Sequence, residues 1–299
     1  SLVAAVVMKA LNKGPEGQTL TEIADLDMQL KALRQKFGLD YLPSCIHLSK
    51  QNNYNRANKL DQDSMKFLQK RFGTLCCYST AGNYFPALNG NTFIDWNGDG
   101  VANEELYLEG EQCLVWLLGG VPLTSGGQIK MIGFSTNVTN PALMPQSQGE
   151  RRDGPYYEFK TERLVSFVSG LQGNTAKAAF PVYIDGWYRA GVKGAVAPYG
   201  VPYAFLSGYG TETGNYQQYS GLASSDCPSL GITQPYYISS APTIVYVNGS
   251  TWQIISAGND GTFGPGGQWN SSTGLGPASG VAGDDQSNFA RGVLRAPAN

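Results

Sequence analysis

The segment from residue 19 to residue 38, TLTEIADLDMQLKALRQKFG, constrains the fold of this chain more than any other part of the sequence. Its apolar residues recur at spacings of three and four, which is the period of an amphipathic α-helix. These residues are Leu20, Ile23, Leu26, Leu30, Leu33 and Phe37. Thr19 and Glu22 form a capping-box pattern at the start of the helix, and Gly38 suits its C-terminal cap. We therefore predict a helix that buries one face against the rest of the protein.

A short apolar run, Leu2 to Met8, precedes this helix; Lys9 interrupts it, and we expect the Gly14-Pro15 pair to end it. The run is too short to cross a bilayer, which takes about 20 apolar residues. Neither an initiator Met nor a charged leading segment stands before it, so we expect a processed or truncated terminus that belonged to a longer apolar helix. The alternative is a short buried helix or strand.

Composition argues against several classes of function. Charged residues make up 15% of the chain and the formal net charge is -2, so we expect no basic surface that attracts nucleic acid. His47 is the only histidine, which removes the usual Ser/His/Asp and Cys/His sites. The clustered glutamates are interpreted as exposed charge at a helix N-terminus, not as glycosidase carboxylates. They are Glu104, Glu105, Glu109 and Glu111. We therefore predict that the chain is not an enzyme.

The cysteines show none of the spacings of a zinc site. They are Cys45, Cys76, Cys77, Cys113 and Cys227. An oxidising compartment would allow one or two disulfides, whereas the alternative is that they are small buried hydrophobic residues. The 38 glycines, 17 tyrosines and 16 prolines are typical of secreted and surface-exposed chains, so we expect an extracytoplasmic location, which is the cell surface, the periplasm or the extracellular medium.

Two shorter helices are predicted, over residues 60–73 and 109–118. After about residue 120 the sequence changes to short apolar or aromatic runs that are separated by Gly, Pro and Asn. Residues 243–256 predict two strands joined by the Asn248-Gly249 turn, which is a strong hairpin signal. The C-terminal half is therefore expected to consist of strands and loops.

The segment DWNGDG offers oxygen ligands at alternate positions, in Asp95, Asn97 and Asp99, followed by a glycine. This arrangement lets a tight loop wrap a hard cation such as calcium, and Asn103 falls at the ninth position of such a loop. Leu106 stands at the twelfth position, where a glutamate is expected. Calcium binding is one interpretation, and an Asx-rich turn without metal is the other.

A second acidic region lies near the C-terminus, where SAGNDGTFGPGG from Ser256 is followed by GDDQSNF from Gly283. Gly/Ser-rich stretches near 206–232 and 261–288 exceed the usual length of loops. Because the two acidic segments contain few hydrophobic residues, a bridging cation would offset the entropy lost when they become ordered. Ordinary Asp-Gly turns are the alternative.

These elements stand in the order found in type IV pilin-like proteins, and the chain resembles the major pseudopilin family of type II secretion. The segments that carry the resemblance are EIADLDMQLKALRQKFGLDYLPS from Glu22, IDGWY from Ile184 with YGVPYAF from Tyr199, ISAGNDGTFG from Ile255, and GDDQSNF from Gly283. The stretch IDWNGDGVANEELYLEGEQCLVWLLGG resembles an insertion in a group of large prepilin-type proteins. The GFTLIE-like start of the family is absent from this sequence, and Phe289 stands where tryptophan is usual.

The resemblance implies an α+β fold that is pilin-like, with an N-terminal helix packed on an antiparallel β-sheet and long elaborated loops. Residues 1–38 would form the N-terminal assembly helix region, and residues 39–299 the globular head. The head would carry an insertion around residues 90–120 and a calcium-loop region at residues 255–290.

The resemblance also implies calcium as the bound ion. The ligands carried over by motif are Asp260, Asp284 and Asp285, with Ser287 and Asn288 as further candidates. Together with the first loop, these residues complete the set of metal ligands predicted from the sequence.

The function implied is that of a structural subunit of a pilus, a pseudopilus or an extracellular filament. Its partners would be copies of itself and other pilins, with no nucleic acid, and it would meet a membrane only through a missing or truncated apolar helix. The alternative is a secreted calcium-dependent adhesin or carbohydrate-binding module, which would be a monomeric β-sandwich without a packed N-terminal helix. A secreted hydrolase would need carboxylates that converge in a cleft.

Overall fold

The fold is that of a computed structural model, in which residues 2–73, 93–147, 149–171, 179–187, 200–210, 216, 219, 225–231, 234–270 and 283–294 are described. For residues 2–13 only the backbone is described. Cys76, Cys77 and parts of the two Gly/Ser-rich stretches lie outside the described residues. The three α-helices of the described part are α1 (Leu2–Lys36), α2 (Lys59–Phe72) and α3 (Gly110–Gly119).

The strands are short and form small sheets. They are β1 (Ile46–Ser49), β2 (Glu105–Leu108), β3 (Pro122–Ser125), β4 (Gln128–Met131), β5 (Phe134–Ser135), β6 (Arg152–Asp153), β7 (Leu164–Phe167), β8 (Phe180–Tyr183), β9 (Ala204–Ser207), β10 (Tyr236–Ser239), β11 (Val245–Tyr246), β12 (Trp252–Ser256), β13 (Gly267–Gln268) and β14 (Gln286–Ser287). Short 3₁₀ turns are η1 (Thr161–Arg163) and η2 (Pro228–Leu230).

The described strands pair in groups of two or three. The three-stranded sheets have the orders β14-β12-β9 and β11-β10-β13, and the pairs are β1-β2, β3-β4, β5-β6 and β7-β8. All of these pairings are antiparallel except that of β10 with β13. A mixture of helices and small antiparallel sheets agrees with the predicted α+β class. Instead of a single large sheet, however, the described strands form several small ones.

Helix α1 is longer than the sequence predicted. It runs through Gly14 and Pro15, where we expected a break, and Thr19 lies inside the helix. Proline removes one backbone donor but keeps a helical φ, so it need not end a helix. The capping-box prediction for Thr19 and Glu22 is therefore wrong. The predicted C-terminal cap is confirmed, since Gly38 has φ +57° and the amide of Leu39 donates to the carbonyl of Arg34 at 3.0 Å.

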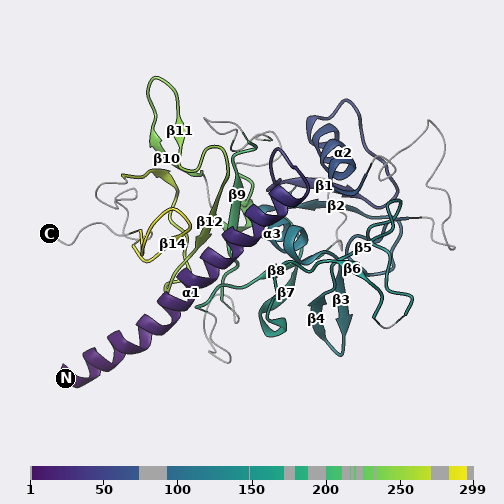
Figure 1. The fold of residues 1–299 in the computed structure, drawn as a ribbon. Helices are drawn as coiled ribbons and strands as arrows, with labels where there is room; N and C mark the ends of the chain where they lie inside the picture. Colours follow the sequence, from purple (N-terminus) through teal and green to yellow (C-terminus); the bar gives the residue numbers. More distant parts are fainter. Residues whose placement is uncertain are drawn as a thin grey trace.

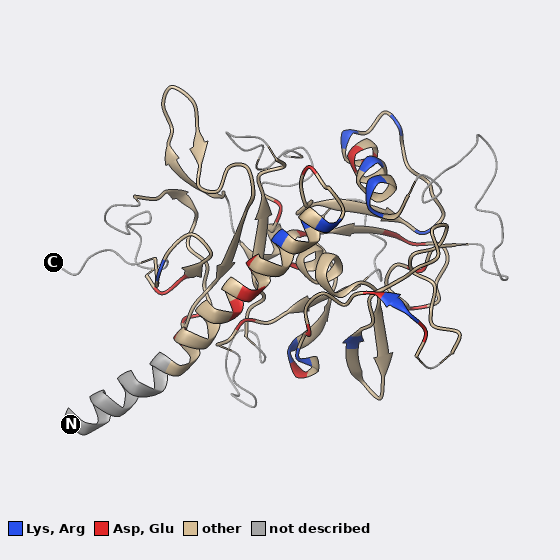
Figure 2. Ribbon diagram, viewed as in Figure 1, with Lys and Arg blue, Asp and Glu red and all other residues tan. Residues whose placement is uncertain are grey.

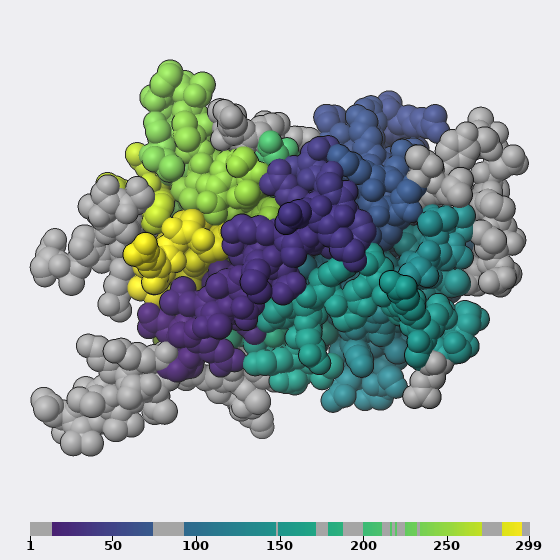
Figure 3. All heavy atoms as spheres, in the orientation of Figure 1, coloured from purple at the N-terminus to yellow at the C-terminus, as the bar shows by residue number. Residues whose placement is uncertain are grey.

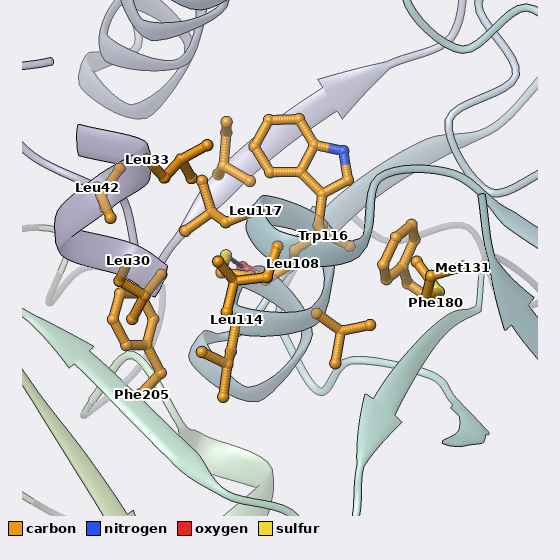
Figure 4. Packing of buried hydrophobic residues seen from close by; sticks show 14 of the residues in the cluster. Leu30, Leu33, Leu42, Leu108, Leu114, Trp116, Leu117, Met131, Phe180 and Phe205 are labelled. Atoms are coloured by element: carbon orange, nitrogen blue, oxygen red, sulfur yellow. Dashed lines mark hydrogen bonds between the residues drawn. The ribbon is translucent and has the colours of Figure 1, made fainter. Parts of the chain in front are cut away.

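The leucine periodicity of α1 correctly predicted its buried face. Ile23, Leu26, Leu30 and Leu33 are each at most 1% exposed. They pack on α3, all of whose residues are buried, and Figure 4 shows Leu30 and Leu33 directed toward the leucines of this central helix. Burial of each such side chain stabilises the fold by roughly 1.5–3 kcal/mol.

Helix α1 also lies across the sheet β14-β12-β9, and it contacts β12 and β14. Its N-terminal end extends away from the sheets, whereas its C-terminal half crosses the body of the protein (Figure 1). In Figure 3, α1 separates the C-terminal strands from the middle of the chain on the visible face. No helix of the described part combines the length and the apolar character needed to cross a membrane.

The predicted helices over 60–73 and 109–118 correspond to α2 and α3. The turn at Asn248 is also present, with φ +53° and a bond from the amide of Thr251 to its carbonyl. The predicted hairpin is nevertheless wrong, because β11 pairs with β10 while β12 pairs with β9 and β14. The turn fixes only the local change of direction, and strand pairing is decided by contacts distant in sequence.

Substitution of a buried α1 leucine tests this packing. We expect Leu26→Ala to lower the free energy of unfolding by about 2–5 kcal/mol, because it leaves a cavity between α1 and the rest of the core. Met28, which is 55% exposed on the same helix, provides the control, and Met28→Ala should change stability by no more than about 0.5 kcal/mol. Urea unfolding followed by tryptophan fluorescence measures both, and equal effects would contradict the assigned face.

Candidate calcium loops and the helix anchor

A buried carboxylate fixes α1 to the head of the protein. The guanidinium of Arg163 donates to Glu22 through both terminal nitrogens, at 2.8 Å to Oε1 and 2.5 Å to Oε2. The hydroxyls of Tyr183 and Tyr203 donate to the same carboxylate at 3.0 and 2.5 Å. Burial by itself would raise the pKa of Glu22, but the hydrogen bonds and charge of Arg163 outweigh it and hold the pKa below its usual range. Glu22 is therefore an ionised cross-link.

A second anchor lies one to two turns further along α1. Asp27 Oδ1 accepts a hydrogen bond from Trp252 Nε1 at 2.9 Å and another from Asn288 Nδ2 at 3.1 Å. Gln286 Nε2 donates to the carbonyl of Glu16 at 2.9 Å. These bonds tie α1 to β12 and to the segment that contains β14. No local sequence pattern indicates either anchor, because the residues that bond to Glu22 and Asp27 lie far from them along the chain.

The two loops that contain the predicted C-terminal ligands Asp260, Asp284 and Asp285 are joined by hydrogen bonds, although the three carboxylates do not form a group that could hold a metal ion. The amide of Asp260 donates to Asp284 Oδ2 at 2.9 Å, and the amide of Gly264 donates to Asp285 Oδ2 at 2.9 Å. Gly258 has φ +67°, and a Cβ at this position would lie 2.3 Å from the carbonyl oxygen of Asp284, so the two loops approach closely only with glycine there. The two acidic segments are thus adjacent.

Two buried oxygens in this region have no hydrogen-bond partner among the described residues. Asp285 is fully buried, and its Oδ1 has no hydrogen-bond partner in the described part of the chain. Burial is the main cause that raises its pKa to about 7, and the carboxylates of Asp284 and Asp260 add to the shift. The hydroxyl of Ser287 is likewise buried without a described partner, but Ser287 lines a cavity against α1 with Ile23 and Asp27. The amide of Gly264 and the hydroxyl of Tyr236 offset part of the cost of burying Asp285, but among the described residues no positive charge acts on this carboxylate.

Asn288, by contrast, does not face the loops as a ligand. Its Oδ1 accepts a hydrogen bond from the amide of Ile254 at 3.0 Å, and its Nδ2 donates to Asp27 and Trp252. The prediction for Asn288 is corrected accordingly, because the side chain fastens α1 to β12. Among the described residues, no three His, Cys, Asp or Glu side chains form a group ready to hold a metal ion.

In the first acidic loop a lysine stands where the sequence pattern predicted calcium. The Nζ of Lys50 lies 3.0 Å from Asp95 Oδ1, 2.5 Å from Asp99 Oδ1 and 3.0 Å from Glu104 Oε2. It also donates to the carbonyl of Val101 at 2.8 Å. Carboxylates at the first and fifth loop positions and a backbone carbonyl are oxygen ligands of the calcium-loop pattern. Here they surround an ammonium group.

The remaining residues of the first loop have other partners. Asn97 Nδ2 donates to Asp99 Oδ2 at 2.8 Å, and Asn103 Oδ1 accepts a bond from Gln51 Nε2 at 2.5 Å. Asn103 is therefore not directed at the cation. The sequence pattern predicted calcium in this loop, but the ammonium group of Lys50 lies among its oxygens instead. We call it the lysine-filled loop. The physical reason is that the pairing of β1 with β2 places Lys50, which is 0% exposed, next to Glu104.

His47 has a structural environment. Its Nδ1 lies 2.7 Å from Asp61 Oδ1, its Nε2 lies 2.8 Å from Glu105 Oε2, and its ring stacks on Tyr107 with centroids 4.1 Å apart. The hydroxyl of Ser49 donates to Glu105 at 3.2 Å and not to the imidazole. This arrangement links β1, α2 and β2, and it does not pair a hydroxyl nucleophile with its base.

The glutamates of α3 are buried, so their interpretation as exposed surface charge is wrong. Glu109 belongs to a capping box with Gln112 and accepts hydrogen bonds from Ser169 and Ser229. The carboxyl group of Glu111 is fully buried and interacts with the carboxyl group of Glu109 and the thiol of Cys227. Burial, with a contribution from Glu109, raises the pKa of Glu111 well above its ordinary value.

The cysteines of the described part are buried free thiols. They are Cys45, Cys113 and Cys227. Burial raises the pKa of each thiol well above its ordinary value, which keeps the sulfur protonated. For these three residues the interpretation as small hydrophobic side chains applies.

No protein-family model, no curated protein and no solved structure matches the chain. The function is therefore inferred from the residues and their contacts.

Replacement of Lys50 tests the lysine-filled loop. We expect Lys50→Met to create a calcium site, because Asp95, Asp99 and Glu104 then lack a positive charge. Without calcium the variant should be less stable by up to about 3 kcal/mol, since removing the ammonium group leaves the buried Glu104 and the half-buried Asp95 and Asp99 uncompensated. Calorimetric titration should find one more bound calcium ion per chain than in the unmodified protein. The exposed Lys70→Met serves as the control, and an unchanged stoichiometry in Lys50→Met would reject the assignment.

The contacts of His47 predict a dependence of stability on pH. Burial opposes protonation, but Asp61 and Glu105 outweigh it and raise the pKa of His47 above its ordinary 6.5. The contribution to stability is therefore fully present below about pH 6.5 and is lost as the pH rises through the higher folded-state pKa. We expect the difference in unfolding free energy between the unmodified protein and His47→Gln to shrink over this range, measured by urea unfolding at a series of pH values. A constant difference would contradict the prediction.

Proposed function

We propose that the chain is a structural subunit of a pilus, a pseudopilus or an extracellular filament, and that it assembles with copies of itself and with other pilins through α1. In this proposal the fold is pilin-like, the location is extracytoplasmic, and the protein is not an enzyme. The observation that carries the proposal is the combination of a 35-residue helix with contacts at Glu16, Glu22 and Asp27 that attach it to the head from Glu16 onward.

These contacts give the N-terminal part of α1 a fixed base. Isolated helices shorter than about 12–15 residues are marginal in water, and most helical stability in proteins comes from packing. Leu2 to Met8 is apolar in sequence, and the end of the helix that contains it extends away from the sheets (Figure 1). Side-by-side packing of such segments between subunits would bury this surface, with roughly 1.5–3 kcal/mol for each fully shielded Leu or Val.

Calcium has a defined place in this proposal. The adjacent Asp260, Asp284 and Asp285 would supply carboxylate ligands, with backbone carbonyls and the hydroxyl of Ser287 as further oxygens. Support comes from the buried, unpartnered oxygen of Asp285 and from the mutual repulsion of these carboxylates. The alternative, an adhesin or carbohydrate-binding module, was expected to lack a packed N-terminal helix. The packing of α1 therefore favours the filament subunit.

Electron microscopy of the full chain tests assembly. We expect the unmodified protein to form filaments or extended oligomers, and Val6→Lys to abolish them, because a charge would enter the apolar run of α1. Thr124→Lys adds the same charge on β3, which lies apart from α1 in Figure 1, and should leave assembly intact. A monomer under all conditions, or equal loss in both variants, would contradict the proposal.

A thermal shift measurement tests the calcium loops separately. Added calcium should raise the Tm of the unmodified protein, because a ligand that binds only the folded state stabilises it by about 2.7 kcal/mol at 100 times its Kd. Asp284→Asn should reduce this shift, whereas Asp25→Asn, on an exposed position of α1, should not. If chelator and calcium give the same Tm, calcium has no role in these loops.

A further inference from the structure

A cavity of about 530 Å³ opens between the C-terminal ends of α1 and α2 and the strands β5 and β6. Its walls include Lys36 and Phe37 from the end of α1, Arg71 and Phe72 from the end of α2, and Arg151 beside β6. This volume lies within the range of pockets that hold small molecules. The predicted calcium ligands and the α1 anchors lie elsewhere, so the cavity is a separate feature of the head.

The cavity is strongly cationic although the chain is not. Its walls contain four basic side chains, which are Lys36, Arg71, Arg151 and Arg152, and one carboxylate, Asp153. Three positive charges therefore remain locally in a protein whose formal net charge is -2. Figure 2 shows basic residues both at the end of α1 and on β6, which come from distant parts of the chain. Such a concentration of one charge in a concave site attracts anions.

The cations are held in fixed positions. The guanidinium of Arg71 stacks over the ring of Phe37 at 3.6 Å, and its Nη2 donates to Asp153 Oδ2 at 2.7 Å. The Nζ of Lys36 donates to Asp153 Oδ1 at 2.9 Å and to the hydroxyl of Tyr156 at 2.9 Å. Arg71 is only 6% exposed, so its orientation is set before any ligand arrives. One carboxylate thus orients two cations without neutralising the whole site.

The two neighbouring arginines have different roles. Arg152 donates to the carbonyls of Ile132, Leu143 and Gly133 at 2.8, 2.9 and 3.0 Å, so it supports the wall and contributes charge. Arg151 is exposed, and within the described residues it forms no ion pair. Arg151 thus lines the cavity from its exposed side.

We propose that this pocket binds a small organic molecule that carries an oxyanion, either a carboxylate or a phosphate. Arg71 and Lys36 would contact the anionic group, since a planar guanidinium fork suits these oxyanions. Arg151 would close over it from solvent, and the exposed Val138 would contact the uncharged part of the molecule. This inference does not depend on the filament function, because it concerns a different face of the protein.

Titration calorimetry with three ligands that share a glucose-type ring tests the proposal. Glucuronate presents a carboxylate, glucose 6-phosphate presents a phosphate, and glucose presents neither. We expect at least one of the two anions to bind and glucose not to bind. Binding of only one anion identifies the class of ligand, whereas absence of binding by both, or equal binding of glucose, would overturn the proposal.

Charge-reversal variants locate the binding. Arg151→Glu should weaken the affinity for the anion by about tenfold or more, because Arg151 is exposed and can be replaced without disturbing the core. Lys130→Glu makes the same change of charge on β4, outside the cavity, and should leave the affinity within about twofold. Equal weakening in both variants would show a general charge effect and would reject the pocket. Matching Tm values for the two variants confirm that both remain folded.

Discussion

The ion pair between Glu22 and Arg163 is the interaction on which the arrangement of this protein depends. Burying two charges costs several kcal/mol, and the cost is offset only when each polar atom finds a partner. Here two tyrosine hydroxyls donate further hydrogen bonds to the carboxylate of Glu22, and the carbonyl of Ile184 accepts a hydrogen bond from the guanidinium of Arg163. Because such a network has strict geometry, it fixes the rotation of α1 about its axis. The leucine face of the helix alone would tolerate more variation.

Buried charged side chains also join the short strands of the small sheets to distant segments. Lys50 ties the end of β1 to the acidic loop, and His47 ties β1 to α2 and β2. Sheets of two or three short strands bury little area of their own, and an isolated pair of strands is marginal in water. Buried charges that join distant segments can therefore specify which strands pair, in addition to the hydrophobic core around α3. We interpret these networks as devices that give the head one arrangement.

The features that were predicted correctly from the sequence depend on residues that lie close together along the chain. The spacing of leucines identified the buried face of α1, and Gly38 identified its C-terminal cap. The hairpin at Asn248 was predicted wrongly, since its turn is local but the partners of β12 are not. The lysine-filled loop could not be predicted either, because Lys50 lies 45 residues before Asp95 and nothing local links them. Likewise Glu109 and Glu111 follow a pattern of exposed charge, and only the packing of α3 shows that they are buried.

The two acidic loops share a sequence pattern but differ in their charge balance. The first contains its own cation, so its shape does not require a metal ion. The second places Asp285 in the interior with an unpartnered oxygen, and it is followed directly by β14, whose Gln286 bonds to α1. In the proposed function, a calcium ion here would order the segment that holds Asp27 and Glu16 through Asn288 and Gln286. Calcium would then stabilise the base of the assembly helix, and not merely a surface loop.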